Sequence, residues 1–239
     1  YRGYSYSADQ GFNLLYGIEQ VRGSDLEGDT IWGNSANNSI FGLGGNDTIY
    51  GVAGNNYLDG GSNNDTLFAG SGADVMVGGS GDDTLVGDEG DDTLSGGVGS
   101  DKIYGGNFDG TTHTDSGIDT VNYSDALESL KIDLDLSLAG GLATDGTIEG
   151  KSVGSTGDAG QGIDELYGIE NVIGSDYTAD SIYGSNSKNI IISQAYDDYI
   201  EARDGNDTVI SGTGNDTIIS SGESDGVDYY DGGAGSDLL

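Results

Sequence analysis

The residues best suited to chemistry in this sequence are aspartates that recur every nine residues. A run from Ser24 to Tyr104 has Asp or Asn at the sixth place of every nonapeptide, as in GGSGDDTLV (78–86). A second run begins at Ser175 and includes SGTGNDTII (211–219). Carboxylate and carbonyl oxygens are the hard ligands that Ca²⁺ prefers, in sets of about six to eight. The spacing therefore predicts a series of calcium sites, with Ca²⁺ as the bound ion.

The elements that must position these aspartates are short strands separated by tight corners. Each nonapeptide has six turn-forming residues followed by three extended ones, and Gly at the corners permits a positive φ. The eighth residue is aliphatic throughout the first run: Ile31, Ile40, Ile49, Leu58, Leu67, Met76, Leu85, Leu94 and Ile103. One such unit cannot bury its apolar side chain alone, but stacked units can. We predict an all-β fold: a parallel β-roll or β-helix solenoid with Ca²⁺ in the turns.

Stacking would align the sixth residues in columns. If two nonapeptides complete one coil, residues 18 apart lie one strand spacing apart, about 4.8 Å. In the first run one column is Asp29, Asp47, Asp65, Asp83 and Asp101, and the other is Asn38, Asn56, Asp74 and Asp92. In the second run the columns are Asp180, Asp198 and Asp216, and Asn189, Asp207 and Asp225, with a three-residue insertion at 229–231 before Asp237 begins another turn. The predicted ligands are these aspartates and the corner glycines Gly45, Gly72, Gly81, Gly90, Gly99, Gly214 and Gly235.

The predicted sites differ in strength along the columns. An Asn ligand carries no charge, so we expect weak or empty sites near Asn38 and Asn56. Several corners depart from the pattern because another residue replaces the fourth Gly, among them Glu27, Ala36, Asn63, Ser187 and Tyr196. A carboxylate-rich site between most of the remaining corners accommodates on the order of ten Ca²⁺.

Composition supports ion-dependent folding and excludes several classes. The chain has 42 acidic and 7 basic residues, a formal charge of −35, 46 Gly, and no Pro or Cys. Collagen, disulfide frameworks and thiolate chemistry are excluded. So few cations argue against a nucleic-acid partner, and no apolar run is long enough for membrane insertion. A single His, His113, lies in a polar loop, and the Asp82/Asp83 pair falls on repeat positions, so we expect no enzyme.

The chain divides into four segments. Residues 24–104 form the first repeat block and 175–239 the second, joined by a non-repeat spacer, 105–174, with strand-like alternation at 119–123 and 130–138 and a loop at 140–162. Residues 15–40 and 166–191 agree at 14 of 26 positions. Residues 1–23 therefore look like the end of another spacer, and we expect a segment of a longer array.

The outward positions seven and nine form ordered files, with three open interpretations. In one column they read Thr30/Trp32, Thr48/Tyr50, Thr66/Phe68, Thr84/Val86 and Lys102/Tyr104. They fit cross-strand stacking, a lateral contact with another chain or a neighbouring repeat, or a face that binds cell-surface glycans or ice. In the second block Ile190, Ile192, Ile210 and Ile219 also point outward, and we expect the spacer or a neighbour to cover them.

The pattern GGxGxDxUx resembles the RTX repeat of calcium-binding β-rolls. GGSGDDTLV, GGVGSDKIY, SGTGNDTII and GGAGSDLL match it closely, and the spacer resembles those interleaved with RTX blocks in very large secreted proteins. The resemblance implies type I secretion without a cleaved N-terminal signal, and folding outside the cell, where weak sites fill and metal binding drives folding.

The resemblance leaves the parent protein open. One hypothesis is a structural module of an extracellular adhesin, surface layer or fibre, which associates with itself or with neighbouring repeats. Another is the non-catalytic region of a secreted enzyme or cytolysin, and a third is a ligand-binding face for glycans or ice.

Overall fold

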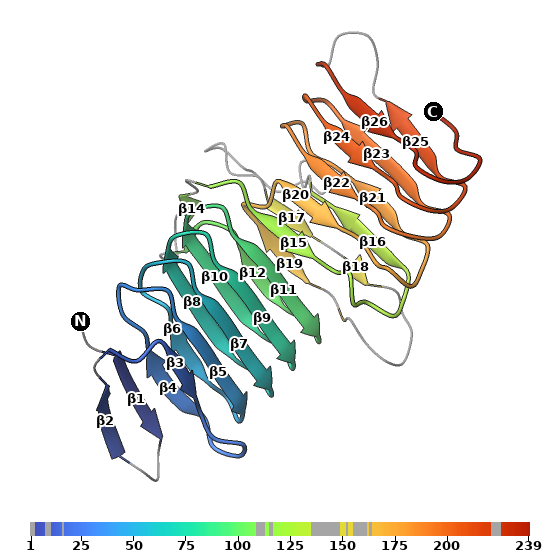
Figure 1. The fold of residues 1–239 in the computed structure, drawn as a ribbon. Coiled ribbons are helices and arrows are strands. Elements are labelled where there is room, and N and C mark those ends of the chain that lie inside the picture. Colours follow the sequence, from blue (N-terminus) through green and yellow to red (C-terminus); the bar gives the residue numbers. More distant parts are fainter. Residues whose placement is uncertain are drawn as a thin grey trace. The chain divides into compact units, whose positions relative to one another are not determined.

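The computed structural model describes residues 3–7, 11–15, 17–108, 113–114, 117–134, 149–151, 153–154, 162, 164–220 and 226–239. Across these residues every regular element is a β-strand, and no helix is long and apolar enough to cross a membrane. The chain forms two compact units, Tyr1–Asp119 and Thr120–Leu239. Within each unit, most strands stack in parallel (Figure 1).

The first unit contains two sheets that share the coils of the first repeat block. One sheet has the order β12 (Lys102–Tyr104), β10 (Thr84–Glu89), β8 (Thr66–Ser71), β6 (Thr48–Tyr50), β4 (Asp29–Trp32), β1 (Gly3–Ser7) and β2 (Gly11–Leu15). The other has the order β11 (Thr93–Val98), β9 (Val75–Ser80), β7 (Tyr57–Ser62), β5 (Ser39–Gly44) and β3 (Gln20–Arg22). In these two sheets the antiparallel pairs are β1 with β2 and β1 with β4, and the other neighbouring strands named above pair in parallel. A small hairpin joins β13 (Asn107–Phe108) and β14 (His113–Thr114).

The second unit repeats this arrangement. One of its sheets has the order β26 (Tyr229–Asp231), β24 (Thr208–Ile210), β22 (Ile190–Ile192), β20 (Asn171–Ile173) and β15 (Thr120–Asn122). Another has the order β18 (Val153–Gly154), β16 (Leu130–Asp133), β21 (Ser181–Tyr183), β23 (Tyr199–Arg203) and β25 (Thr217–Ser220). Strand β17 (Glu149–Lys151) pairs antiparallel with β19 (Glu165–Tyr167).

Register and burial confirm the predicted solenoid. Thr84 pairs with Thr66 and Leu85 with Leu67, which places nonapeptides 18 residues apart directly over one another. The nine aliphatic residues at position eight have no exposed surface, whereas most flanking residues at positions seven and nine are half-buried. One side chain of three therefore builds the core, and the other two face outward, as the period predicts.

The spacer contributes coils of its own. The predicted strand at 119–123 is present as β15, and the one at 130–138 begins as β16. Residues 135–138 and most of 140–162 lie outside the described residues. Where 140–162 is described it contains β17 and β18, so the prediction of a loop was wrong there.

Candidate calcium-binding corners

Most corners have a left-handed backbone at positions two and four. In the corner 78–83 these positions are Gly79 and Gly81, with φ of 114° and 135°. All seven predicted corner glycines lie at position four with φ between 100° and 153°. Two corners without Gly keep this conformation, at Asn63 (φ 77°) and Tyr196 (φ 80°). Glu27, Ala36 and Ser187 do not have a positive φ, so their corners form a different turn.

The sixth residues form hydrogen-bonded columns, as the spacing predicts. The backbone N–H of Asp47 donates to Oδ1 of Asp65 (2.7 Å), that of Asp65 to Asp83 (2.7 Å), and that of Asp83 to Asp101 (2.8 Å). The other columns repeat this bond, through Asn38, Asn56, Asp74 and Asp92 in the first block and through Asp180, Asp198 and Asp216 or Asn189 and Asp207 in the second. Oδ1 is thus used to hold consecutive coils together.

The last coils correct one predicted ligand. Asp225 lies outside the described residues, but the place above Asp207 that we predicted for it is taken by Asp228. The Asp207 N–H donates to Oδ1 of Asp228 (2.9 Å), and Tyr229 pairs with Thr208. The three extra residues therefore precede Asp228, and the predicted insertion at 229–231 was wrong, since 229–231 is the strand β26. Asp237 follows in register and is exposed; its Oδ1 accepts the Asp216 N–H (3.1 Å).

The second carboxylate oxygens are the unusual feature of these corners. Oδ2 is buried and has no hydrogen-bond partner in six of the described aspartates: Asp47, Asp65, Asp74, Asp83, Asp198 and Asp216. All six residues are at most 2% exposed. A buried polar atom without a partner costs about 1–3 kcal/mol, and more when it is charged. The folded chain therefore needs a positive partner for these oxygens.

Burial also disturbs the titration of the columns. Loss of solvent, together with the neighbouring charges of Asp83 and Asp47, raises the pKa of Asp65 to about 7. Burial likewise raises the pKa of Asp47 and Asp83 to about 6 and that of Asp198 to about 7. The columns are therefore poised to take up either protons or cations.

The oxygens converge on small spaces that a cation fits. A methyl group added at Gly78 would lie 2.5 Å from Asp83 Oδ2 and 2.5 Å from the carbonyl oxygen of Gly96, one coil further on. At Gly60 the corresponding distances are 2.5 Å to Asp65 Oδ2 and 2.7 Å to the Gly78 carbonyl. A carboxylate oxygen and a carbonyl oxygen of consecutive coils thus line each space, which is the hard-oxygen environment that suits Ca²⁺.

Asn56 shows what these spaces require. Its Nδ2 donates to the carbonyl oxygens of Gly54 (3.0 Å) and of Ala69 (3.5 Å), the first residue of the next repeat in its column. The NH₂ group of Asn56 thus donates hydrogen bonds to these carbonyl oxygens. An aspartate at the same place has no such donor. This contact supports our prediction of a weak or empty site near Asn56.

The residues present would hold Ca²⁺ by single carboxylates and backbone carbonyls. In the described part of the chain, no three His, Cys, Asp or Glu side chains gather in a way that could hold a metal. The donor set would be the Asp Oδ2 at position six, the carbonyl at position four of the same corner and the carbonyl at position one of the next coil. Calcium bound there would supply the missing positive charge.

Two predicted ligands differ from the others. Oδ2 of Asp29 accepts the backbone N–H of Ser24 (2.6 Å), and Oδ2 of Asp180 accepts that of Ser175 (2.7 Å). Both aspartates begin their columns. Their second oxygens already have partners, so the argument from an unpartnered oxygen does not apply to them.

Sequence reasoning missed Asp119. The N–H of Asp92 donates to Oδ1 of Asp119 (2.8 Å), 27 residues away, so Asp119 continues the second column after a longer connection. The segment Gly117–Val121 reads GIDTV, which is the second half of a repeat and was a visible signal.

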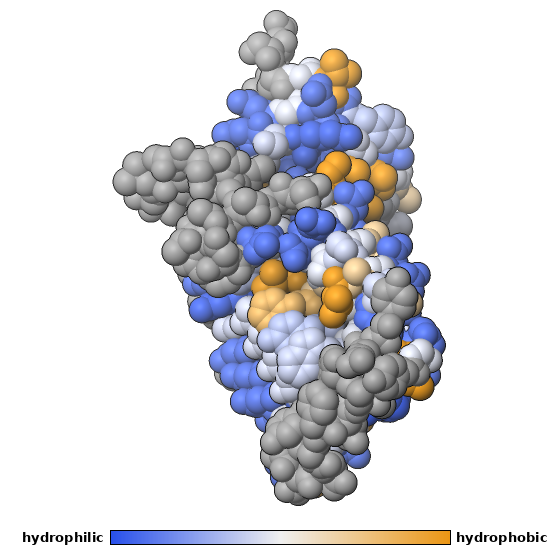
Figure 2. All heavy atoms as spheres, turned by 90° about the vertical axis from the view of Figure 1, so that its left-hand side faces the viewer, coloured by the Kyte–Doolittle hydropathy of each residue, from blue (hydrophilic) through white to orange (hydrophobic). Residues whose placement is uncertain are grey.

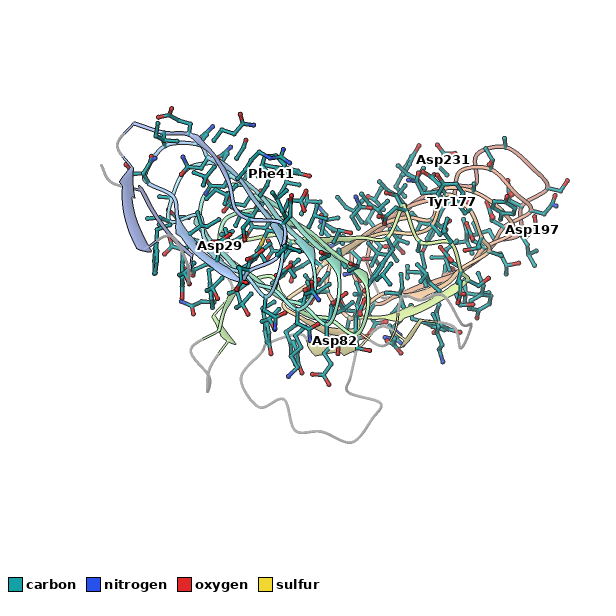
Figure 3. The ribbon with its side chains drawn as sticks, turned by 90° about the horizontal axis from the view of Figure 1, so that it is seen from below. Asp29, Phe41, Asp82, Tyr177, Asp197 and Asp231 are labelled. Carbon is teal, nitrogen blue, oxygen red and sulfur yellow. The ribbon has the colours of Figure 1, made fainter. Side chains whose placement is uncertain are left out.

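Sequence reasoning also missed a ladder at position five. The N–H of Asp82 donates to Oδ1 of Asn64 (3.1 Å), and that of Ser100 to Oδ1 of Asp82 (2.9 Å). Asp82 and Asp197 are exposed and lie at the outside of their corners (Figure 3). The paired Asn and Asp residues at positions five and six therefore have different tasks: five ties corners together at the surface, and six lines the buried spaces.

The outward aromatic file is a stacked ladder. The rings of Trp32 and Tyr50 lie 5.1 Å apart at 7°, and those of Tyr50 and Phe68 5.0 Å apart at 6°. Each ring covers the face of the next, so cross-strand stacking accounts for the file.

The remaining outward hydrophobic residues form no large continuous surface in the view of Figure 2. There, hydrophobic residues form small patches among hydrophilic ones. Of the four outward isoleucines in the second unit, Ile190, Ile192 and Ile210 are half-buried and Ile219 is 37% exposed.

The fold and its corners define a class, a parallel β-solenoid with turns suited to calcium. A family model described as the RTX calcium-binding nonapeptide repeat (4 copies) matches residues 25–58, 41–76, 50–85, 77–111, 179–218 and 224–239. These matches cover more than half of the chain, which belongs to this family. Its repeats bind calcium, and proteins that carry them are typically secreted. No curated protein matches the chain.

Proposed function

We propose that this chain is a structural module of a large extracellular protein, folding and stiffening when it meets Ca²⁺ after export. The observation that carries the proposal is the set of six buried Oδ2 atoms without partners. About ten Ca²⁺ would satisfy such corners and reduce the charge from −35 to about −15. Binding free energy would thus become folding free energy.

Repetition favours an adhesin, surface layer or fibre over the non-catalytic region of an enzyme. The segments 15–40 and 166–191 are similar and lie 151 residues apart. Their first corners also make the same hydrogen bonds, at Ser24 and at Ser175. A unit of block and spacer that recurs in this way suits a protein that spans distance. The stacked rings of Trp32, Tyr50 and Phe68 expose few faces to a sugar, so we do not propose glycan binding.

A titration of the full chain followed by far-UV circular dichroism tests the proposal. In EGTA we expect a coil spectrum, because the aspartates within each column repel one another and their Oδ2 atoms lack partners. Calcium in the millimolar range should produce a cooperative β signal, and Mg²⁺ at the same concentration should not, since it demands a stricter geometry. A complete β spectrum in EGTA would contradict the proposal.

A further inference from the structure

The first coil of each repeat block differs from all later coils in how its corners are closed. We call residues 24–41 and 175–192 the lead coils. In the first, the Ser24 N–H donates to Asp29 Oδ2 (2.6 Å), and the Ser24 hydroxyl donates to the Glu27 carbonyl (2.8 Å). In its second corner, the Asn34 N–H donates to Asn38 Oδ1 (2.8 Å). Both corners of this lead coil are thus closed by hydrogen bonds that involve the protein's own side chains.

The lead coil of the second block makes the same backbone N–H bonds to its Asp and Asn side chains, but its serine hydroxyl has a different acceptor. The Ser175 N–H donates to Asp180 Oδ2 (2.7 Å), and the Ser175 hydroxyl donates to the Ala126 carbonyl (2.6 Å). In the second corner, the Ser185 N–H donates to Asn189 Oδ1 (2.7 Å). The arrangement recurs 151 residues further along the chain, where the surrounding residues differ, so it is a regular feature of how a block begins.

The lead coils also bond to the chain that precedes them. Asn34 Nδ2 donates to the Ile18 carbonyl (3.1 Å), and Asn189 Nδ2 donates to the Glu170 carbonyl (2.6 Å). Asp180 Oδ1 accepts the Leu130 N–H (3.0 Å), so both of its oxygens have partners. One neutral atom, Asn38 Nδ2, is buried without an acceptor. No carboxylate oxygen of Asp29 or Asp180 is buried without a partner, in contrast to Asp47, Asp65 and Asp198.

We propose that the lead coils close without calcium and serve as the templates on which calcium adds the later coils. This inference rests on the proposed function. In a solenoid each repeat is stabilised by its neighbours, and the lead coils have theirs in the preceding non-repeat strands: β3 pairs with β5, β16 with β21, and β20 with β22. A lead coil held by its own hydrogen bonds supplies half of the first calcium space before any ion binds. Calcium-driven folding then proceeds from the start of each block toward its end, with Asp29, Asn38, Asp180 and Asn189 outside the set of calcium ligands.

Two variants of the full chain test this template role. Ser175→Ala removes the hydroxyl bond to Ala126 and the bond that the Ser175 hydroxyl accepts from the Tyr177 N–H (2.9 Å). Asn34→Ala removes the bonds to Ile18 and from the Ala36 N–H (2.8 Å). Because lost bonds in a folding nucleus slow folding, each variant should fold on calcium addition roughly five- to thirty-fold more slowly. The number of calcium ions bound at saturation, counted by equilibrium dialysis, should not change.

Ser80→Ala is the matched control, because Ser80 is an exposed serine in a later corner. It should fold at the parent rate. Pulsed hydrogen exchange read by mass spectrometry gives the order of events. Amides of 24–41 and 175–192 should gain protection before those of 60–104 and 193–220.

The outcomes separate the two proposals. If the parent chain binds calcium and folds, but 60–104 is protected first or Ser175→Ala folds at the parent rate, the template role is wrong and the proposed function stands. If Asp29→Asn reduces the number of bound ions, the lead coils do bind calcium and the inference is also wrong. If the parent chain binds no calcium, the proposed function itself fails.

Discussion

Replacing one column aspartate by asparagine should change stability in opposite directions with and without calcium. Asp65 is the best position, because its Oδ1 accepts the Asp47 N–H while its Oδ2 is buried without a partner. Asn at 65 keeps an oxygen for the ladder and presents an NH₂ group to the Gly78 carbonyl, as Asn56 does to Ala69. In EGTA, Asp65→Asn therefore removes the cost of a buried unpaired oxygen and should stabilise the fold by about 1–3 kcal/mol.

In calcium the same substitution should destabilise the fold. For a site with a dissociation constant of about 10⁻⁴ M, 100 mM Ca²⁺ is about a thousandfold excess and contributes about 4.1 kcal/mol per ion. Loss of one ion removes that contribution, and the gain of about 1–3 kcal/mol from removing the unpaired oxygen offsets part of it. The net loss of stability should therefore be about 1–3 kcal/mol. Asn56→Asp is the matched reversal: it should gain about one ion and stabilise the fold in calcium, but destabilise it in EGTA.

Urea unfolding followed by fluorescence of the single tryptophan, Trp32, measures both effects. An excluded osmolyte such as trimethylamine N-oxide keeps the calcium-free chain folded for the comparison. The reasoning is refuted if Asp65→Asn shifts stability in the same direction under both conditions, because Oδ2 would then not be the atom that calcium satisfies.

Three further predictions follow from the same geometry. First, in EGTA the folded-state pKa values of about 6 to 7 at Asp47, Asp65, Asp83 and Asp198 lie above the ordinary value of 3.8. The stability that protonation gives is therefore complete below about pH 4 and lost as the pH rises through 6 to 7; circular dichroism should show β structure appearing on acidification, and no gain at pH 4 would contradict this. Second, Leu67→Ala, at a fully buried position, should cost about 2–5 kcal/mol in urea unfolding with calcium; a cost under 1 kcal/mol would mean that position eight is not the core. Third, Tyr50→Leu should lose about 0.5–1.5 kcal/mol of ring stacking while the number of bound ions stays constant, and a lower count would tie the ladder to the sites.

The parts of this fold set by strict periodicity were predictable from the sequence. An aliphatic residue at position eight of each nonapeptide can be buried only inside the stacked coils, so the burial of Ile49 and Leu85 could be predicted without coordinates. The column partners of Asp47 and Asp65 follow from the same count, since two nonapeptides make one coil.

Positions at which the count is interrupted were not predictable. An insertion can precede or follow an aspartate, and both Asp225 and Asp228 stand near the expected spacing in ESDGVDYYD (223–231). The structure places Tyr230, half-buried, opposite Val209, whereas Val227 is 83% exposed. The strand-forming Tyr-Tyr pair therefore fixed the register, against an apparent match to the repeat. Asp119 was missed for a related reason, because it rejoins its column after 27 residues.

The distribution of Asp and Asn along the columns has a physical logic. A corner closed by an amide, as at Asn56, contains no carboxylate oxygen that needs an ion. Aspartate at the same place leaves Oδ2 of residues such as Asp74 and Asp83 buried without a partner, and under the proposed function this would make folding conditional on a cation. The lead coils carry hydrogen bonds to Oδ2 of Asp29 and Asp180 that Asp47 and Asp198 in the next coils lack. Under the two proposals, the order of amide-closed and carboxylate-lined corners would set both when the chain folds and where folding starts.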